Sequence, residues 1–242
     1  EATGGASWRN STGWLSGDPC DGWFGIYCDS AKAHVIEVFP NPRFSGNTLI
    51  GTIPGSFWDL TELEHIYLSN DRPGWSILQG SLPAAIGSLH KLKCLYTSHA
   101  GNLSGPLPAE ISGLDQMQGL YLRWNSWTGK LPDLSRMRGL TKLIIDASPI
   151  DDCARGWCQS AFSGTLDALA AANLPLKHLD VAGNSFTGKF PEALCAIPEC
   201  DAFGNHFEGG LPAGCCKNVK RDTTALPGPR NGNDCHPHDF PG

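Results

Sequence analysis

A six-residue cassette, apolar-x-Gly-x-apolar-Pro, recurs seven times along the chain, with Asp167 in place of the proline in one copy. Its glycines lie at positions 51, 80, 105, 129, 164, 188 and 209. Consecutive copies are therefore 29, 25, 24, 35, 24 and 21 residues apart. Repeats of roughly 20 to 50 residues are typical of solenoids, in which each repeat forms one coil and neighbouring coils share a core.

A second pattern, apolar-x-x-apolar-x-apolar, precedes most cassettes and ends in alternation, as at Leu120 and Leu122. Alternation over so few residues predicts a short strand with one buried face. Asn125, Asn184 and Asn205 follow such strands at the position where a side-chain amide can bond backbone groups that the bend leaves unpaired. We therefore expect about seven short parallel strands on the concave side and little regular helix outside the amino-terminal cap.

The first apolar residue of each cassette is predicted to lie in one continuous core, because every coil repeats the same packing position. The large side chains expected there are Leu103, Trp127, Phe162, Phe186 and Phe207.

The cassette and strand patterns resemble the plant-type extracellular leucine-rich repeat, as found in receptor ectodomains and polygalacturonase-inhibiting proteins. Trp14, Asp18-Pro19-Cys20, Trp23 and Cys28 resemble the paired-cysteine cap of that family. The resemblance covers about residues 8–213. It implies an α/β repeat fold: a right-handed solenoid with a concave parallel sheet and disulfide-capped ends.

This resemblance divides the chain into an amino-terminal cysteine cap over residues 1–34, a solenoid over 35–213 and a carboxyl-terminal cap with a Pro/Gly-rich tail over 214–242. It also implies a bond between Cys20 and Cys28 in the first cap. Cys153 and Cys158 are expected to close a small loop in the 35-residue repeat.

The remaining six cysteines allow 15 pairings, among which the sequence does not choose. They are Cys94, Cys195, Cys200, Cys215, Cys216 and Cys235. The strand register places Cys94 on the concave face, where we expect an exposed thiol joined to Cys235 of the tail or to a second chain. Cysteine spacings that lack a second matching pair disfavour zinc, and we expect neither a metal nor a cofactor.

Composition limits the class of protein and its partners. A formal net charge of −6 disfavours a nucleic-acid partner, which needs a concentrated positive face. No apolar run approaches the roughly 18 residues of a membrane helix. Ten cysteines beside two methionines, with sequons at Asn10 and Asn102 as candidate glycosylation sites, favour an extracellular location, secreted or in a cell wall.

Stacking the strands in register predicts a central column on the concave face, in which four aromatic rings are followed by acidic residues. Its members are Phe39, Tyr67, Tyr96, Tyr121, Ile144, Asp180 and Asp201. With strands about 4.8 Å apart the rings cover roughly 14 Å. With residues of the flanking columns, the candidate binding residues are Phe39, His65, Tyr67, Tyr96, Tyr121, Arg123 and Asp180. The alternative is that the aromatic neighbours simply stabilise the sheet.

No catalytic constellation stands out, because no pair of carboxylates is placed for glycoside hydrolysis and no Gly-x-Ser-x-Gly elbow occurs. The leading hypothesis is a non-catalytic recognition module that binds a protein, peptide or glycan on its concave face. One alternative is a structural subunit that self-assembles into an extracellular filament or wall layer. A weaker one is an ice-binding protein, which requires a more regular array of small side chains than the cassettes provide.

Overall fold

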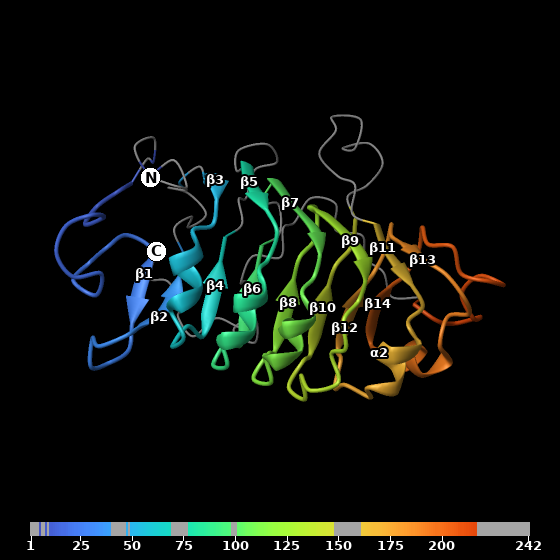
Figure 1. Cartoon of the computed structure of the whole chain (residues 1–242). Helices are drawn as coiled ribbons and strands as arrows, with labels where there is room; N and C mark the ends of the chain where they lie inside the picture. The colour runs from blue at the N-terminus through green and yellow to red at the C-terminus, as the bar shows by residue number, and fades with distance from the viewer. Residues whose placement is uncertain are drawn as a thin grey trace.

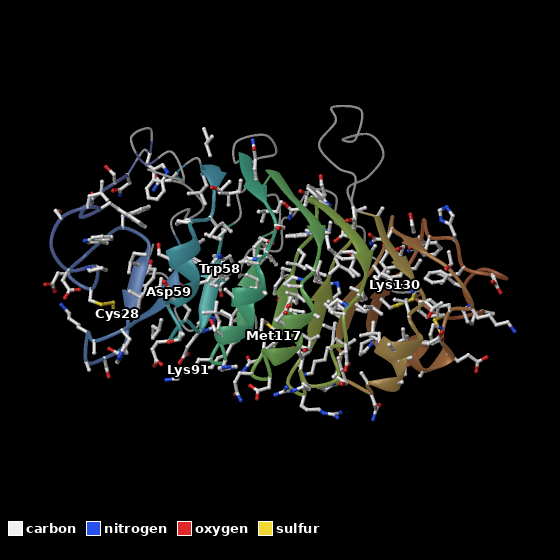
Figure 2. The ribbon with its side chains drawn as sticks, viewed as in Figure 1. Cys28, Trp58, Asp59, Lys91, Met117 and Lys130 are labelled. Atoms are coloured by element: carbon white, nitrogen blue, oxygen red, sulfur yellow. A yellow bond between two sulfur atoms is a disulfide. The ribbon has the colours of Figure 1, made fainter. Side chains whose placement is uncertain are left out.

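A computed structural model describes residues 5, 8, 10–39, 47, 49–68, 77–97, 101–147 and 161–216. Over these residues the backbone forms successive coils, and Figure 1 shows them stacked side by side from the blue amino-terminal end to the orange last coil. From β2 to β12 each coil contributes one strand to each of two sheets, and side chains fill the space between them (Figure 2). The chain is a solenoid, as the repeat spacing predicts, and it is right-handed, as the resemblance implies.

The concave sheet has eight strands, of which seven run parallel and β1 pairs antiparallel with β2. In sheet order they are β1 (Ile26–Cys28), β2 (Val35–Val38), β4 (His65–Tyr67), β6 (Cys94–Tyr96), β8 (Gly119–Tyr121), β10 (Lys142–Ile144), β12 (His178–Asp180) and β14 (Glu199–Asp201). The prediction of about seven parallel strands is confirmed. In the concave strands β4, β6, β8, β10 and β12, the middle residue is fully buried between the sheets.

Six of the seven cassettes form a second sheet of six strands, which the sequence patterns did not predict, whereas the last cassette forms no strand. In sheet order these are β13 (Ser185–Phe186), β11 (Ala161–Gly164), β9 (Ser126–Lys130), β7 (Gly101–Pro106), β5 (Ile77–Gly80) and β3 (Ile50–Thr52). A glycine at its centre makes each cassette a poor strand by propensity. The strands form because the same segment of the next coil lies within hydrogen-bonding distance.

All seven cassette glycines have a positive φ, between 74° at Gly188 and 111° at Gly51. Residues with a Cβ rarely adopt this conformation. It turns the chain after the buried apolar residue, which explains why glycine recurs at this position.

Short helices connect the two sheets, along the edge that faces down in Figure 1. Four 3-10 helices follow cassette prolines: η2 (Gly55–Asp59), η3 (Ala84–Ser88), η4 (Ala109–Gly113) and η5 (Glu192–Ala196). In the cassette that lacks its proline, Asp167 instead begins the α-helix α2 (Asp167–Ala171), where its charge suits the helix amino terminus.

One apolar cluster runs through the solenoid from Val38 to Cys216. Leu103, Trp127, Phe162 and Phe186 lie in it as predicted, whereas Phe207 in the last coil is only partly buried against it. Trp127 also satisfies its indole N–H, which donates to the Leu122 carbonyl at 2.8 Å.

The three asparagines form a ladder of hydrogen bonds, as the sequence indicates. The amide of Asn184 donates to the carbonyls of Ile145 and Val181, both at 3.0 Å, and its Oδ1 accepts the backbone N–H of Phe162 at 3.1 Å. Asn125 and Asn205 likewise donate to carbonyls of their own coil and of the preceding one. Each asparagine therefore joins two coils.

Disulfides close both ends of the described solenoid. The predicted Cys20–Cys28 bond is confirmed, and Figure 2 shows the sulfur of Cys28 beside β1. At the other end Cys195 bonds Cys215 and Cys200 bonds Cys216. Cys153, Cys158 and Cys235, for which bonds were also predicted, lie outside the described residues.

We expect Phe186→Ala to lower the free energy of unfolding by about 3–5 kcal/mol, because it leaves a cavity where a fully buried ring stood. Chemical denaturation followed by circular dichroism measures this. The half-exposed Phe203→Ala is the matched control and should cost less than about 1 kcal/mol. A loss below about 1 kcal/mol at Phe186 would contradict its position in the core.

Asn184→Ala should cost at least about 2 kcal/mol, since it leaves three backbone groups without their partner. Thr128→Ala, at an exposed position of β9, controls for a change on the solenoid surface. Equal stability of the two variants would show that the asparagine ladder is dispensable.

Candidate functional site

The outward-facing columns of the concave sheet follow the predicted register. Tyr67 pairs with Tyr96, Tyr96 with Tyr121 and Tyr121 with Ile144. The same column continues through Asp180 to Asp201. A flanking column runs through Glu37, His65, Cys94, Gly119, Lys142, His178 and Glu199. The structure therefore brings the predicted candidate residues onto one face.

The aromatic part of this column forms a row of rings in contact, which we call the aromatic row: Phe39, Tyr67, Tyr96 and Tyr121. Ring centroids are 5.3 Å apart for Phe39 and Tyr67, 6.2 Å for Tyr67 and Tyr96, and 5.0 Å for Tyr96 and Tyr121. Tyr67 and Tyr121 are each only 6% exposed, whereas Tyr96 is half-buried. The row packs as a small second apolar cluster, so ring contacts add to the stability of the sheet.

Cys94 belongs to this second cluster and is 0% exposed. The expectation of an exposed thiol at this position is wrong, because the small side chain of Cys94 packs in the cluster with Phe39, Tyr67, Tyr121 and Ile144. The predicted bond to Cys235 involves a residue outside the described part of the chain.

Two polar side chains beside the aromatic row are also buried. His65 stacks on Tyr67 with ring planes 2° apart, and its Nε2 lies 4.0 Å from Oε2 of Glu64. Burial raises the pKa of Glu37 to about 7. This half of the concave face is therefore less charged near neutral pH than its sequence suggests.

The carboxyl-terminal half of the face is built around an ion pair. A guanidinium nitrogen of Arg123 donates to Asp146 Oδ2 at 2.9 Å and lies 4.0 Å from Asp180 Oδ2. The indole N–H of Trp124 donates to the same oxygen of Asp146 at 3.1 Å. Sequence reasoning did not include Trp124 or Asp146 among the candidates, although Asp146 lies in register next to Arg123.

Three carboxylates gather at this end, those of Asp146, Asp180 and Asp201, and burial raises the pKa of the first two. Burial and the nearby charge of Asp146 raise the pKa of Asp180 to about 8. Burial also raises the pKa of Asp146, against the opposing charge of Arg123. Asp180 and Asp201 each fix one oxygen by accepting a backbone N–H two residues on, from Ala182 and Phe203.

The last two strands carry the most accessible groups on the face. His178 Nδ1 lies 3.1 Å from Glu199 Oε2, and the Glu199 side chain is 67% exposed. Phe203 is 50% exposed and lines an open hollow of about 490 Å³ together with Phe207 and Leu211. An exposed ring on the same face as carboxylates and a histidine offers both contact area and directed polar groups. We call Glu199, Phe203 and their neighbours His178 and Asp201 the open end.

The two sequons lie away from this face. Asn10 is half-buried near the amino-terminal cap, with its Oδ1 accepting the backbone N–H of Thr12, and Asn102 lies in β7 of the second sheet. Their glycosylation stays a prediction. Among the described residues no group of three or more His, Cys, Asp or Glu side chains is arranged to hold a metal ion.

Comparison with known proteins gives one family and a consistent group of relatives. A leucine-rich repeat family model matches residues 175–197. The chain is 27% identical over 202 residues to Receptor-like protein 39 of Arabidopsis thaliana, covering 72% of this chain. That match takes in 21% of the relative, so the chain spans about a fifth of its length.

Solved structures show the same architecture. The structure of a Pollen Receptor Kinase 3 is 28% identical with a TM-score of 0.64, covering 85% of this chain and 88% of that one. The PEPR1–AtPEP1 crystal structure is 25% identical with a TM-score of 0.58, covering 78% of this chain and 23% of that one. No helix of the described residues is long and apolar enough to cross a membrane. The cassettes, the coil geometry and these likenesses agree: the chain has the leucine-rich repeat solenoid architecture and is similar to plant receptor-like proteins.

Proposed function

We propose that this chain is a non-catalytic extracellular recognition module that binds an extended peptide or a segment of a partner protein on its concave face. The observation that carries the proposal is the open end, where Phe203 and Glu199 stand exposed beside a buried network of Arg123 and three carboxylates. A rigid polar network next to an exposed ring suits recognition, since rings supply area and fixed polar groups supply orientation.

The shape of the face favours an extended ligand. From β2 to β14 the concave sheet spans six strand spacings, about 29 Å, which is the length of about nine extended residues. A ligand of that shape lies across the strands and meets one column residue per coil. The PEPR1–AtPEP1 structure supports such a role by likeness of fold and sequence.

Extracellular location is part of the same proposal. Three disulfides join six cysteines of the described residues, and such bonds persist in oxidising compartments. The alternative, a subunit that self-assembles into a filament, predicts a different oligomeric state in solution. Size-exclusion chromatography with light scattering should give a monomer for a recognition module, and large concentration-dependent polymers would favour the filament.

Selection of binders from a displayed library of random linear peptides tests the proposal directly. We expect selected peptides to lose at least about tenfold in affinity to Phe203→Ala, the size of effect typical of an anchor ring. The matched control is Ile50→Ser, which removes a 43% exposed apolar side chain from the second sheet and should leave affinity unchanged. Isothermal titration calorimetry measures both variants. Equal losses for both, or a loss only for Ile50→Ser, would contradict binding on the concave face.

The raised pKa of Asp180 predicts that peptide binding depends on pH. Because its pKa is raised to about 8, the carboxyl is mostly protonated at pH about 6 and ionised at pH about 9.5, whereas arginine stays charged throughout. Selected peptides that contain arginine should therefore bind more tightly at the higher pH, by up to about tenfold. Asp180→Asn cannot gain this charge and should abolish the difference. The same tightening in Asp180→Asn would assign the effect to another group.

A further inference from the structure

The residue before each asparagine of the ladder has a left-handed backbone conformation. In two of the three coils this residue is glycine, with a φ of 70° at Gly183 and of 69° at Gly204. In the third coil it is Trp124, with a φ of 57°. This conformation is sterically unfavourable for a residue with a Cβ, and a bulky side chain there is a clear outlier. The chain therefore has a strained tryptophan where two other coils have an unstrained glycine.

Neither the backbone nor the core explains the tryptophan. The backbone N–H of Trp124 donates to the carbonyl of Asp146 in the next coil at 3.2 Å, and Gly183 makes the equivalent bond to Phe203 at 2.8 Å. The Trp124 side chain is half-buried and belongs to neither apolar cluster of the described residues. Strained residues that persist without such a reason cluster at functional sites. The strain therefore points to a role for the side chain on the concave face.

The indole of Trp124 contacts both members of the ion pair. Its N–H donates to Oδ2 of Asp146 at 3.1 Å, and the guanidinium carbon of Arg123 lies 5.1 Å from the ring centroid. Nε and Nη2 of Arg123 donate to the same oxygen of Asp146 at 3.3 and 2.9 Å. A cation over an aromatic face and a charge-assisted hydrogen bond both favour one placement of the guanidinium. The ring and the carboxylate together fix the orientation of Arg123.

Arg123 keeps one donor group for a ligand. Its side chain is 16% exposed, and no described residue accepts a hydrogen bond from its other terminal nitrogen, Nη1. Because the guanidinium is a rigid plane, holding Nε and Nη2 also sets the direction of the Nη1 donors. We propose that Trp124 is a positioning residue of the recognition site, which orients Arg123 so that Nη1 donates to an oxygen of the bound peptide. This inference rests on the proposed binding of a peptide on the concave face.

Trp124→Gly separates positioning from stability. Because glycine adopts this backbone without strain, the melting temperature should change by no more than about 4 °C. Loss of a core tryptophan would instead lower it by roughly 10 °C or more. A peptide selected on the unmodified protein should nevertheless lose at least about tenfold in affinity, measured by isothermal titration calorimetry. Unchanged affinity would overturn the proposal, and so would a fall in melting temperature of the size expected for a core residue.

A matched pair of conservative variants isolates the indole hydrogen bond. Trp124→Phe loses the bond to Asp146, and Trp23→Phe loses a bond of 2.8 Å to the Ser16 carbonyl in the amino-terminal cap. Trp124→Phe should lower the affinity by about threefold or more, since the ring stays and one donor is lost. Trp23→Phe should leave the affinity unchanged. Equal losses in both variants would contradict a specific role for Trp124.

A double-mutant cycle tests whether Trp124 acts through Arg123. Arg123→Gln, which shortens the reach of the donors and removes the charge, should itself lower the affinity by at least about tenfold. Adding Trp124→Gly to Arg123→Gln should then cost less than about a further twofold, because the residue to be positioned is already absent. Losses that multiply in the double variant would show that Trp124 acts independently of Arg123 and would overturn its role as a positioning residue.

Modification of arginine by phenylglyoxal tests the orientation of Arg123 without a ligand. Peptide mass spectrometry should show at least about fivefold faster modification of Arg123 in Trp124→Gly, because the ring no longer holds the guanidinium. The exposed Arg136 is the internal reference and should react equally in both proteins. An unchanged rate at Arg123 would overturn the proposal. If no library peptide binds at all, the proposed function fails, whereas the rate at Arg123 still decides whether Trp124 orients it.

Discussion

Burial shared between neighbouring coils is the interaction on which the whole structure depends. A single coil cannot enclose its own apolar residues, such as Leu120, Leu122 and Trp127, because their buried surfaces are covered by the neighbouring coils. Only when coils stack do these positions merge into the cluster that runs from Val38 to Cys216. Stability is then a property of coil interfaces, which makes the two ends the weak points. The Cys20–Cys28 bond and the pair of disulfides in the last coil lie at these ends.

The repeat made much of this fold predictable from sequence. Glycine positions and alternation gave the coil, the number of parallel concave strands and the register that aligns Tyr67, Tyr96 and Tyr121. Asn184 could be assigned its role because a bend always leaves backbone groups to satisfy. The second sheet could not be predicted in this way, since its strands exist only through pairing with the next coil and contradict the local propensity of glycine.

Accessibility on the concave face could not be predicted either. Alternation tells which side of a sheet a residue faces, but it says nothing of what lies over that side. Cys94 was therefore placed correctly in register and wrongly in exposure, and Tyr67, a candidate binding residue, is only 6% exposed. Asp146 was overlooked because an acidic residue in a column looks like an ordinary solvated group until Arg123 and Trp124 are seen to contact it. The face divides accordingly into a buried aromatic row and an open end with an ordered polar network.

Hydrogen–deuterium exchange of the full-length chain with and without a selected peptide tests recognition on the concave face most directly. Bound peptide should slow exchange in β10, β12 and β14 and in the residues that follow them, where the ion-pair network and the open end lie. It should leave β3, β5 and β7 of the second sheet unchanged. Slower exchange confined to the second sheet would contradict the assignment of the concave face as the binding surface.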